Sequence, residues 1–420
     1  MSYSLLFTIA FAAALVAGMI VEFWLASRQI RHVARHRNTV PPAYAESITL
    51  QGHQRAADYT IAKTRFSILE TACSTAFLLG WTLLGGLDLL NKLLLAWLGG
   101  GMLQQLTLIA AFAAIGGLLG LPFSIYRIFV LEERFGFNKM KWKLWVLDNA
   151  KWMVVGAGLG LPLAALILWL MAAAGSLWWL WAWAAFSFFL LLLQVIFPLF
   201  IAPWFNKFTP LADAALETRV TALLKRCGFA VSGLFVMDGS TRSAHANAYF
   251  TGFGVSKRVV FYDTLLEQLD ASEMEAVLAH ELGHLKHKHL RNHLVMTCLL
   301  NLPAFALLGW VSTQTWFYAG LGVQPNMAAP NNALALLLFM IAVPVFTFFV
   351  APLFSQLSRK NEFEADAYAI SQTSRDALSA ALLKLYRDNA STLTPDPVFV
   401  KFYYSHPPAS ERLARMLATA

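Results

Sequence analysis

The stretch AVLAHELGHLKHKHLRNHLVMTCLLNLPAFALLGWVSTQTWF (276–317) joins a polar-flanked helix signal to a long apolar run. The first part continues a helical spacing of apolar residues, which are Met274, Val277, Leu278 and Leu282. Ser272 and Glu275, three residues apart, predict a capping box at the start of this helix. The second part, 294–317, is long enough to cross a bilayer. The sequence therefore places a helix in water directly before a membrane span.

The composition extends the membrane interpretation to the whole chain. Of its 420 residues, 58% are hydrophobic and 13% are charged, whereas a soluble domain has about 45–50% and about 25%. A span needs about 20 mainly apolar residues. About seven runs reach that length: 4–25, 66–85, 104–126, 152–174, 177–201, 294–317 and 333–355. We interpret 4–25 as a retained helix and not as a signal peptide, because its start lacks Lys and Arg.

The basic residues alternate between loops. The loops 26–65 and 127–151 and the segment after 201 are basic, whereas 86–103 carries only Lys92. The positive-inside rule then predicts an outside N-terminus, with these basic loops and the C-terminus in the cytoplasm. The net charge of +8 follows from these loops and predicts no nucleic-acid binding. The few cysteines, Cys73, Cys227 and Cys298, imply no disulfide framework.

These patterns divide the chain into regions. We expect a membrane region with five helices at 1–201, a polar cytoplasmic region at 202–292, two further membrane helices at 293–355 and a polar C-terminal region at 356–420. Short strands are predicted at 234–237, 248–251 and 258–262. No internal repeat is evident.

The predicted cytoplasmic helix carries the motif HELGH (280–284). His280 and His284 lie one turn apart on one face, so that both imidazoles can reach one Zn²⁺. Glu281 projects beside them and can take a proton from a water molecule that the metal polarises. The pattern indicates a zinc site with a general base.

A third zinc ligand is expected on a second helix, in SRKNEFEADAYA (358–369). Glu362 and Asp366 are spaced i, i+4 and share a face, whereas Glu364 points elsewhere. We expect Glu362 to bind the metal. Asp366 would anchor a zinc histidine through its other ring nitrogen.

Further histidines follow the motif within a basic cluster. This cluster comprises Lys286, His287, Lys288, His289, Arg291 and His293. We interpret it as an interfacial cap where cations meet lipid headgroups, in preference to additional metal ligands. A catalytic zinc needs only three protein ligands and an open position.

The two motifs, separated by two apolar spans, resemble the type I CAAX prenyl protease family of integral-membrane zinc metalloproteases. Further segments share the resemblance, and they are LEERFGFNK (131–139), SAHANAYF (243–250), SHPP (405–408) and ERL (411–413). The likeness runs from about residue 30 to the end of the chain.

The resemblance implies roles for individual residues. His280, His284 and Glu362 would bind one Zn²⁺, and Glu281 would be the general base. Asn247 would contact the substrate backbone from an edge strand. His406 would stabilise the oxyanion, and Arg412 would hold the substrate or His406 in place.

The resemblance also implies a mainly α architecture. About seven transmembrane helices would surround a chamber, with a small α+β zincin-like (gluzincin) catalytic region on the cytosolic side. The polar span residues Glu70, Gln194 and Asn301 would then face the chamber or form hydrogen bonds between helices.

We therefore expect a membrane-embedded zinc metalloendopeptidase acting on a peptide or protein substrate. The family removes the last three residues after a prenylated cysteine. Compact loops and the absence of a dilysine signal near Ala420 favour a bacterial inner-membrane protein. In that setting the alternative is a quality-control protease that cleaves non-prenylated hydrophobic peptides. A zinc-binding transporter is a remote alternative, because such folds often show internal repeats.

Overall fold

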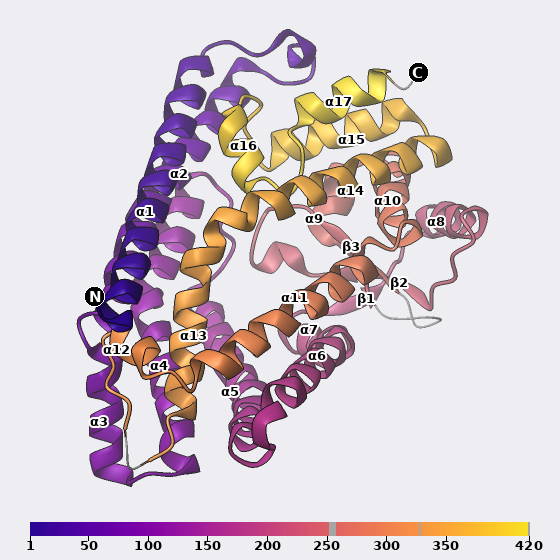
Figure 1. Ribbon diagram of the computed structural model, residues 1–420. Coiled ribbons are helices and arrows are strands. Elements are labelled where there is room, and N and C mark those ends of the chain that lie inside the picture. The colour runs from indigo at the N-terminus through magenta and orange to yellow at the C-terminus, as the bar shows by residue number, and fades with distance from the viewer. Residues whose placement is uncertain (252–257, 327–328, 419–420) are drawn as a thin grey trace.

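The computed structural model describes residues 1–251, 258–326 and 329–418. Long helices form one part of the molecule, and a smaller α+β region lies at one end of them (Figure 1). The long helices are α1 (Tyr3–His36), α2 (Leu50–Trp81), α3 (Gly86–Leu98), α4 (Met102–Tyr126) with its π-helical extension η2 (Arg127–Glu132), α5 (Trp142–Ala173), α6 (Trp178–Ile196) with the π-helical η4 (Phe197–Ile201), α11 (His289–Val311) and α13 (Asn332–Thr347).

The α+β region is built from shorter elements. Its helices are α7 (Ala202–Phe205), α8 (Ala214–Arg226), α9 (Asp263–Gln268), α10 (Ala271–Lys286), α14 (Ala351–Gln372), α15 (Arg375–Asp388), α16 (Pro397–Tyr403) and α17 (Ala409–Ala418). Its strands are β1 (Phe208–Pro210), β2 (Gly233–Met237), β3 (Ala248–Thr251) and β4 (Arg258–Tyr262). The short helix α12 (Thr315–Gly320) lies at the far end of the long helices (Figure 1).

The expected membrane spans are present. Within the described residues, six helices are long and apolar enough to cross a membrane, or seven if α2 and α3, bent by 47°, count as one span. Every predicted run lies on one of these helices. The chain is therefore a polytopic, mainly helical membrane protein.

The helices extend further than the apolar runs indicated. The expected loop 26–65 is largely helical, because α1 continues to His36 and α2 begins at Leu50 with Thr49 as its N-cap. The run 66–85 ends early, since Gly85 adopts a φ of +79° before α3 begins. Hydropathy finds the apolar middle of a helix and cannot register polar turns that continue beyond the bilayer.

Some polar span residues join helices. Glu70 on α2 forms an ion pair with Arg127 of η2, which supports an interhelical role for that residue. In the same manner, the Gln104 amide donates to Asn91 Oδ1 at 2.9 Å, between α4 and α3. Both contacts join polar side chains of neighbouring helical elements.

The sheet has the order β1-β2-β4-β3. The predicted strands correspond to β2, β3 and β4, whereas β1 was not predicted because Pro210 demotes a strand pattern. β2 pairs parallel with β4, and β3 pairs antiparallel with β4. This places β3 at an edge of the sheet, against α10.

The capping box of α10 is not the one that we predicted. Asp270 is the N-cap, and its side chain accepts from the backbone of Ser272 and Glu273. Glu273 in turn accepts from the Asp270 backbone N–H at 2.9 Å. Glu275, which we had paired with Ser272, instead accepts from Arg219 at 2.8 Å. The helix therefore begins two residues earlier than the Ser272–Glu275 pattern indicated.

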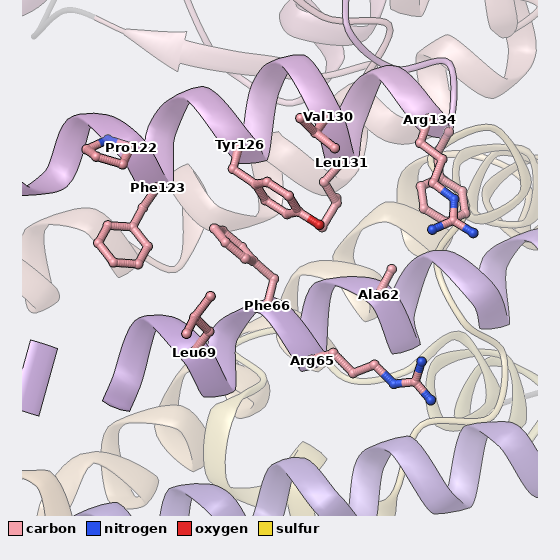
Figure 2. Close-up of a pocket in the computed structure, with 11 residues that line it drawn as sticks. Ala62, Arg65, Phe66, Leu69, Pro122, Phe123, Tyr126, Val130, Leu131 and Arg134 are labelled. Carbon is pink, nitrogen blue, oxygen red and sulfur yellow. The ribbon is translucent and has the colours of Figure 1, made fainter. Parts of the chain in front are cut away.

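An apolar groove of about 510 Å³ lies between the long helices α2 and α4–η2. Figure 2 shows Phe66 and Leu69 of α2 facing Phe123 and Tyr126 of α4 across it. This groove is bordered by membrane helices and not by α10 or α14. The chamber implied by the resemblance stays a prediction.

Candidate metal centre

The structure brings the three expected zinc donors together. His280 and His284 lie on α10, and Glu362 lies on α14. The two imidazole Nε2 atoms are 3.3 Å apart. The Glu362 carboxylate oxygens lie 3.5 Å from His280 Nε2 and 3.4 Å from His284 Nε2.

This spacing fits a zinc ion. Ligand bonds of about 2.0–2.1 Å in a tetrahedron separate neighbouring donors by about 3.3–3.4 Å. One buried carboxylate oxygen, Glu362 Oε2, has no hydrogen-bond partner among the described residues, although His280 and His406 nitrogens lie near it. Two imidazoles and a carboxylate are also the donor set of many catalytic zinc sites.

A close helix crossing sets this geometry. A Cβ atom on Gly283 would come within 2.8 Å of the Ala365 Cα atom. Gly283 stands between the two zinc histidines in sequence, and Ala365 follows Glu362 by three residues. The absence of a side chain at Gly283 therefore lets α10 and α14 approach closely enough to share one metal.

Asp366 holds His280, as the spacing predicted. Its Oδ1 lies 2.9 Å from His280 Nδ1. Such a contact fixes the ring and leaves Nε2 free to bind metal.

Arg412, on α17, reaches the same carboxylate. It donates to Asp366 through Nε at 2.8 Å and Nη2 at 2.5 Å. Both side chains are buried. These contacts place Arg412 against Asp366, and the expectation that Arg412 holds the substrate or His406 stays a prediction.

Glu281 lies on α10 next to the donors. Burial raises the pKa of its carboxyl group above the ordinary value. A general base works best when its pKa is nearer to the operating pH than that of a free carboxylate. The environment of Glu281 thus suits the predicted role.

His406 and Asn247 lie at different parts of the site. The His406 side chain is 67% exposed, and its Nδ1 lies 2.9 Å from Glu362 Oε2. Asn247 is exposed and directly precedes β3, and its side chain accepts from the Ala248 backbone N–H at 2.8 Å. His406 therefore borders the metal centre, whereas Asn247 lies at the start of the edge strand.

The basic cluster after the motif is not only an interfacial cap. His289 is buried, with its Nδ1 at 2.9 Å from His284 Nδ1. Its Nε2 lies 3.1 Å from Glu364 Oε2. His287 and His293 are exposed, as the interfacial interpretation expects. The contact of His289 arises from a fold-back between α10 and α11, which helical periodicity does not register.

Two motifs named for the resemblance pair with each other. Phe137 O accepts from the Ala244 backbone N–H at 3.1 Å, and Asn138 forms a β-bridge with Ser243. The Phe137 and His245 rings stack with centroids 4.5 Å apart. The segment that follows η2 therefore supports the chain as it enters β3.

Comparisons with known proteins agree with this geometry. Residues 29–207 match the model described as CAAX prenyl protease N-terminal, five membrane helices, and residues 210–420 match Peptidase family M48. CAAX prenyl protease 1 of Saccharomyces cerevisiae is 32% identical, over 96% of this chain and 93% of the yeast protein. The chain belongs to the CAAX prenyl protease family. It is a membrane-embedded, zinc-dependent metalloendopeptidase.

Other members of the family confirm the extent of the likeness. A CAAX prenyl protease 1 homolog of Homo sapiens is 29% identical, over 96% of this chain and 94% of its own length. The crystal structure of S. mikatae Ste24p superposes with a TM-score of 0.92 at 30% identity and covers 99% of both chains. The fold class and the family predicted from the sequence are thereby confirmed.

Proposed function

We propose that this protease removes the C-terminal three residues of proteins that end in a prenylated CAAX sequence. The observation that carries the proposal is the likeness to CAAX prenyl protease 1 of yeast along nearly the whole of both chains. A likeness of this extent includes the membrane helices as well as the metal centre.

The sheet edge supports a peptide substrate. β3 pairs with β4 on one side, and within the described residues no strand pairs with its other side. An extended peptide can bind such an edge through backbone hydrogen bonds. Because β3 lies against α10, the bound peptide would pass close to His280 and His284.

The chain's own residues would divide the chemistry between them. Zinc, when held by His280, His284 and Glu362, supplies a Lewis acid that polarises the scissile carbonyl and makes water more acidic. Glu281 would take the proton from the attacking water and return it to the leaving amine. The exposed imidazole of His406 would donate a hydrogen bond to the developing oxyanion.

The Glu281→Gln variant tests this assignment. It keeps the shape of the side chain and removes the base, so that peptidase activity should fall by about 10²–10⁴-fold or more. Zinc content, measured by elemental analysis, should stay at one ion per chain. The Glu275→Gln variant, on the same helix but paired with Arg219, serves as the control. Full activity in Glu281→Gln would refute the mechanism.

The substrate is tested with a matched pair of peptides. A farnesylated peptide ending in CAAX should be cleaved after the modified cysteine, and its unmodified twin should be cleaved much more slowly. Equal cleavage of both, together with cleavage of unrelated hydrophobic peptides, would favour the quality-control alternative. Mass spectrometry of the products identifies the cleavage position.

We also propose an outside N-terminus and a cytoplasmic metal centre, in a bacterial inner membrane. The alternation of basic loops supports the orientation, and the compact loops support a bacterial source, although the relatives named above are eukaryotic. In a variant without native cysteines, a membrane-impermeant maleimide should label Ser2→Cys in intact cells. It should label Asp376→Cys only after lysis, and the reverse pattern would invert the orientation.

A further inference from the structure

A chain of contacts leads from the zinc ligand His284 away from the metal. His284 Nδ1 lies 2.9 Å from His289 Nδ1, and His289 Nε2 lies 3.1 Å from Glu364 Oε2. His289 is buried, and Glu364 is partly exposed. The second zinc histidine is therefore connected to a carboxylate through another imidazole.

The proton positions along this chain follow from the metal site. His284 Nε2 faces the other two donors, so that it must present a lone pair to the metal. Its Nδ1 then carries the proton and donates to His289 Nδ1. His289 must in turn carry its proton on Nε2, where it donates to Glu364 Oε2.

The two zinc histidines are thus supported differently by the same helix. His280 contacts Asp366 of α14 directly at 2.9 Å, whereas His284 reaches Glu364 of α14 through His289. Such outer contacts fix the tautomer and the ring orientation of a metal ligand and raise its basicity.

We propose that His289 and Glu364 are positioning residues that hold His284 in the metal-binding tautomer. This inference rests on the proposed zinc site. It adds a second anchored histidine to the one that Asp366 holds.

The backbone turn at Lys288 brings His289 into contact with His284. Lys288 adopts a φ of +58°, a left-handed conformation that costs free energy in a residue other than glycine. This residue links α10 to α11 and makes His289 the first residue of α11. The sharp turn brings His289 back to His284, five residues earlier in the chain.

The same residues could instead belong to a second metal site. Ligand atoms of His287, His289 and Glu364 lie within 4.8 Å of one another. However, His287 is exposed, and the 3.1 Å separation of His289 Nε2 and Glu364 Oε2 is that of a hydrogen bond. The geometry favours hydrogen bonds from His284 through His289 to Glu364 over a second metal site. The number of zinc ions per protein distinguishes the two arrangements, because a second site would hold a second ion.

The test measures zinc affinity in the full-length protein by competition with a chelator. His289→Ala should weaken zinc binding by about 10–100-fold, and Glu364→Gln should weaken it in the same direction. His289→Gln keeps both an acceptor and a donor, so it should restore most of the affinity. In protein loaded with Co²⁺, the visible spectrum should shift in His289→Ala and return towards wild type in His289→Gln.

Matched controls remove residues of the same type that lie outside the proposed contact chain. His293→Ala removes an exposed histidine one turn along α11, and Glu267→Gln removes an exposed carboxylate on α9. Both controls should bind zinc as the wild type does. Unchanged zinc affinity and an unchanged Co²⁺ spectrum in His289→Ala and Glu364→Gln would overturn the inference. Two zinc ions per wild-type chain, one of which is lost in Glu364→Gln, would also overturn it, because Glu364 would then belong to a second metal site. A wild-type protein without zinc would instead refute the proposed function itself.

Discussion

Asp366 lies between His280, a proposed zinc ligand, and the buried side chain of Arg412. It contacts His280 Nδ1 on one side and receives two hydrogen bonds from Arg412 on the other. The Arg412 side chain is within 3.9 Å of Glu362 as well. Arg412 therefore balances the negative charge of Glu362 and Asp366. We expect it to affect zinc affinity indirectly, by holding Asp366 against His280.

We expect Arg412→Ala to weaken both the fold and the metal site. Removal of one partner of a buried ion pair leaves the other uncompensated and costs about 3–5 kcal/mol. Zinc affinity should fall, because Asp366 is no longer held against His280. Chemical denaturation and chelator competition measure the two effects.

The control for this prediction is Arg387→Ala on α15, whose ion pair with Asp388 is largely exposed. Exposed pairs contribute about 0–1 kcal/mol, so this variant should remain close to wild type. Equal effects of the two substitutions would contradict the role given to the buried pair.

At the scale of elements, the start of α10 shows a limit of sequence patterns. Asp270–Glu273 and Ser272–Glu275 both have the spacing of a capping box. Contacts with other helices decide between them, since Glu273 also pairs with Lys384 of α15 and Glu275 with Arg219 of α8. A local pattern cannot distinguish two overlapping caps when the choice depends on tertiary partners.

The observed cap makes a prediction about stability. Asp270→Ala removes the acceptor of two backbone N–H groups and should cost about 1 kcal/mol, within a range of about 0.5–2 kcal/mol. Ser272→Ala should cost less, because the Ser272 hydroxyl donates to Asp270 Oδ1 at 2.7 Å, and no backbone N–H of the described residues donates to it. Denaturant unfolding measures the loss of stability in the two variants. A larger loss in Ser272→Ala than in Asp270→Ala would favour the Ser272 cap that we expected from the sequence.

The crossing of α10 and α14 makes another prediction. Gly283→Ala places a methyl group within 2.8 Å of the Ala365 Cα atom and must separate the helices. Overpacking of this kind typically costs about 1–3 kcal/mol. Because the helices carry the zinc donors, zinc affinity should fall together with stability, as chelator competition and denaturation would show.

Gly160→Ala on α5 is the matched control. A Cβ atom there meets nothing within 4 Å, and alanine favours a helix over glycine by about 1 kcal/mol. This variant should therefore be as stable as wild type or more stable. If Gly283→Ala also kept the stability and zinc affinity of the wild type, the close crossing of α10 and α14 would not position the metal.

For the molecule as a whole, local sequence signals located the spans and singled out the residues that we propose as zinc donors. Apolar runs of spanning length and the i, i+4 histidines of HELGH are short-range patterns. The pairing of Arg412 with Asp366 and the contact of His289 with Glu364 join distant segments. No local periodicity encodes such contacts, and for that reason the supports of the metal site emerged only from the fold.

Arg242 connects the membrane helices to the catalytic region. Its guanidinium donates to the Asp148 carboxylate of α5 at 2.8 and 3.1 Å, to Asn206 Oδ1 at 3.0 Å and to the Phe205 carbonyl at 2.6 Å. Its own carbonyl accepts from the Lys139 backbone N–H at 3.2 Å. This residue therefore anchors the segment that leads towards the edge strand β3.

We expect Arg242→Ala to loosen this connection without removing zinc. Asp148, which is buried, loses its partner, and stability should fall by about 3–5 kcal/mol. Since Arg242 directly precedes the segment that enters β3, KM for peptides should rise more than kcat falls, while zinc content stays at one ion per chain. Arg226→Ala, whose ion pair with Glu275 is exposed, is the control. An unchanged KM in Arg242→Ala would mean that β3 is positioned by the catalytic region alone, independently of the membrane helices.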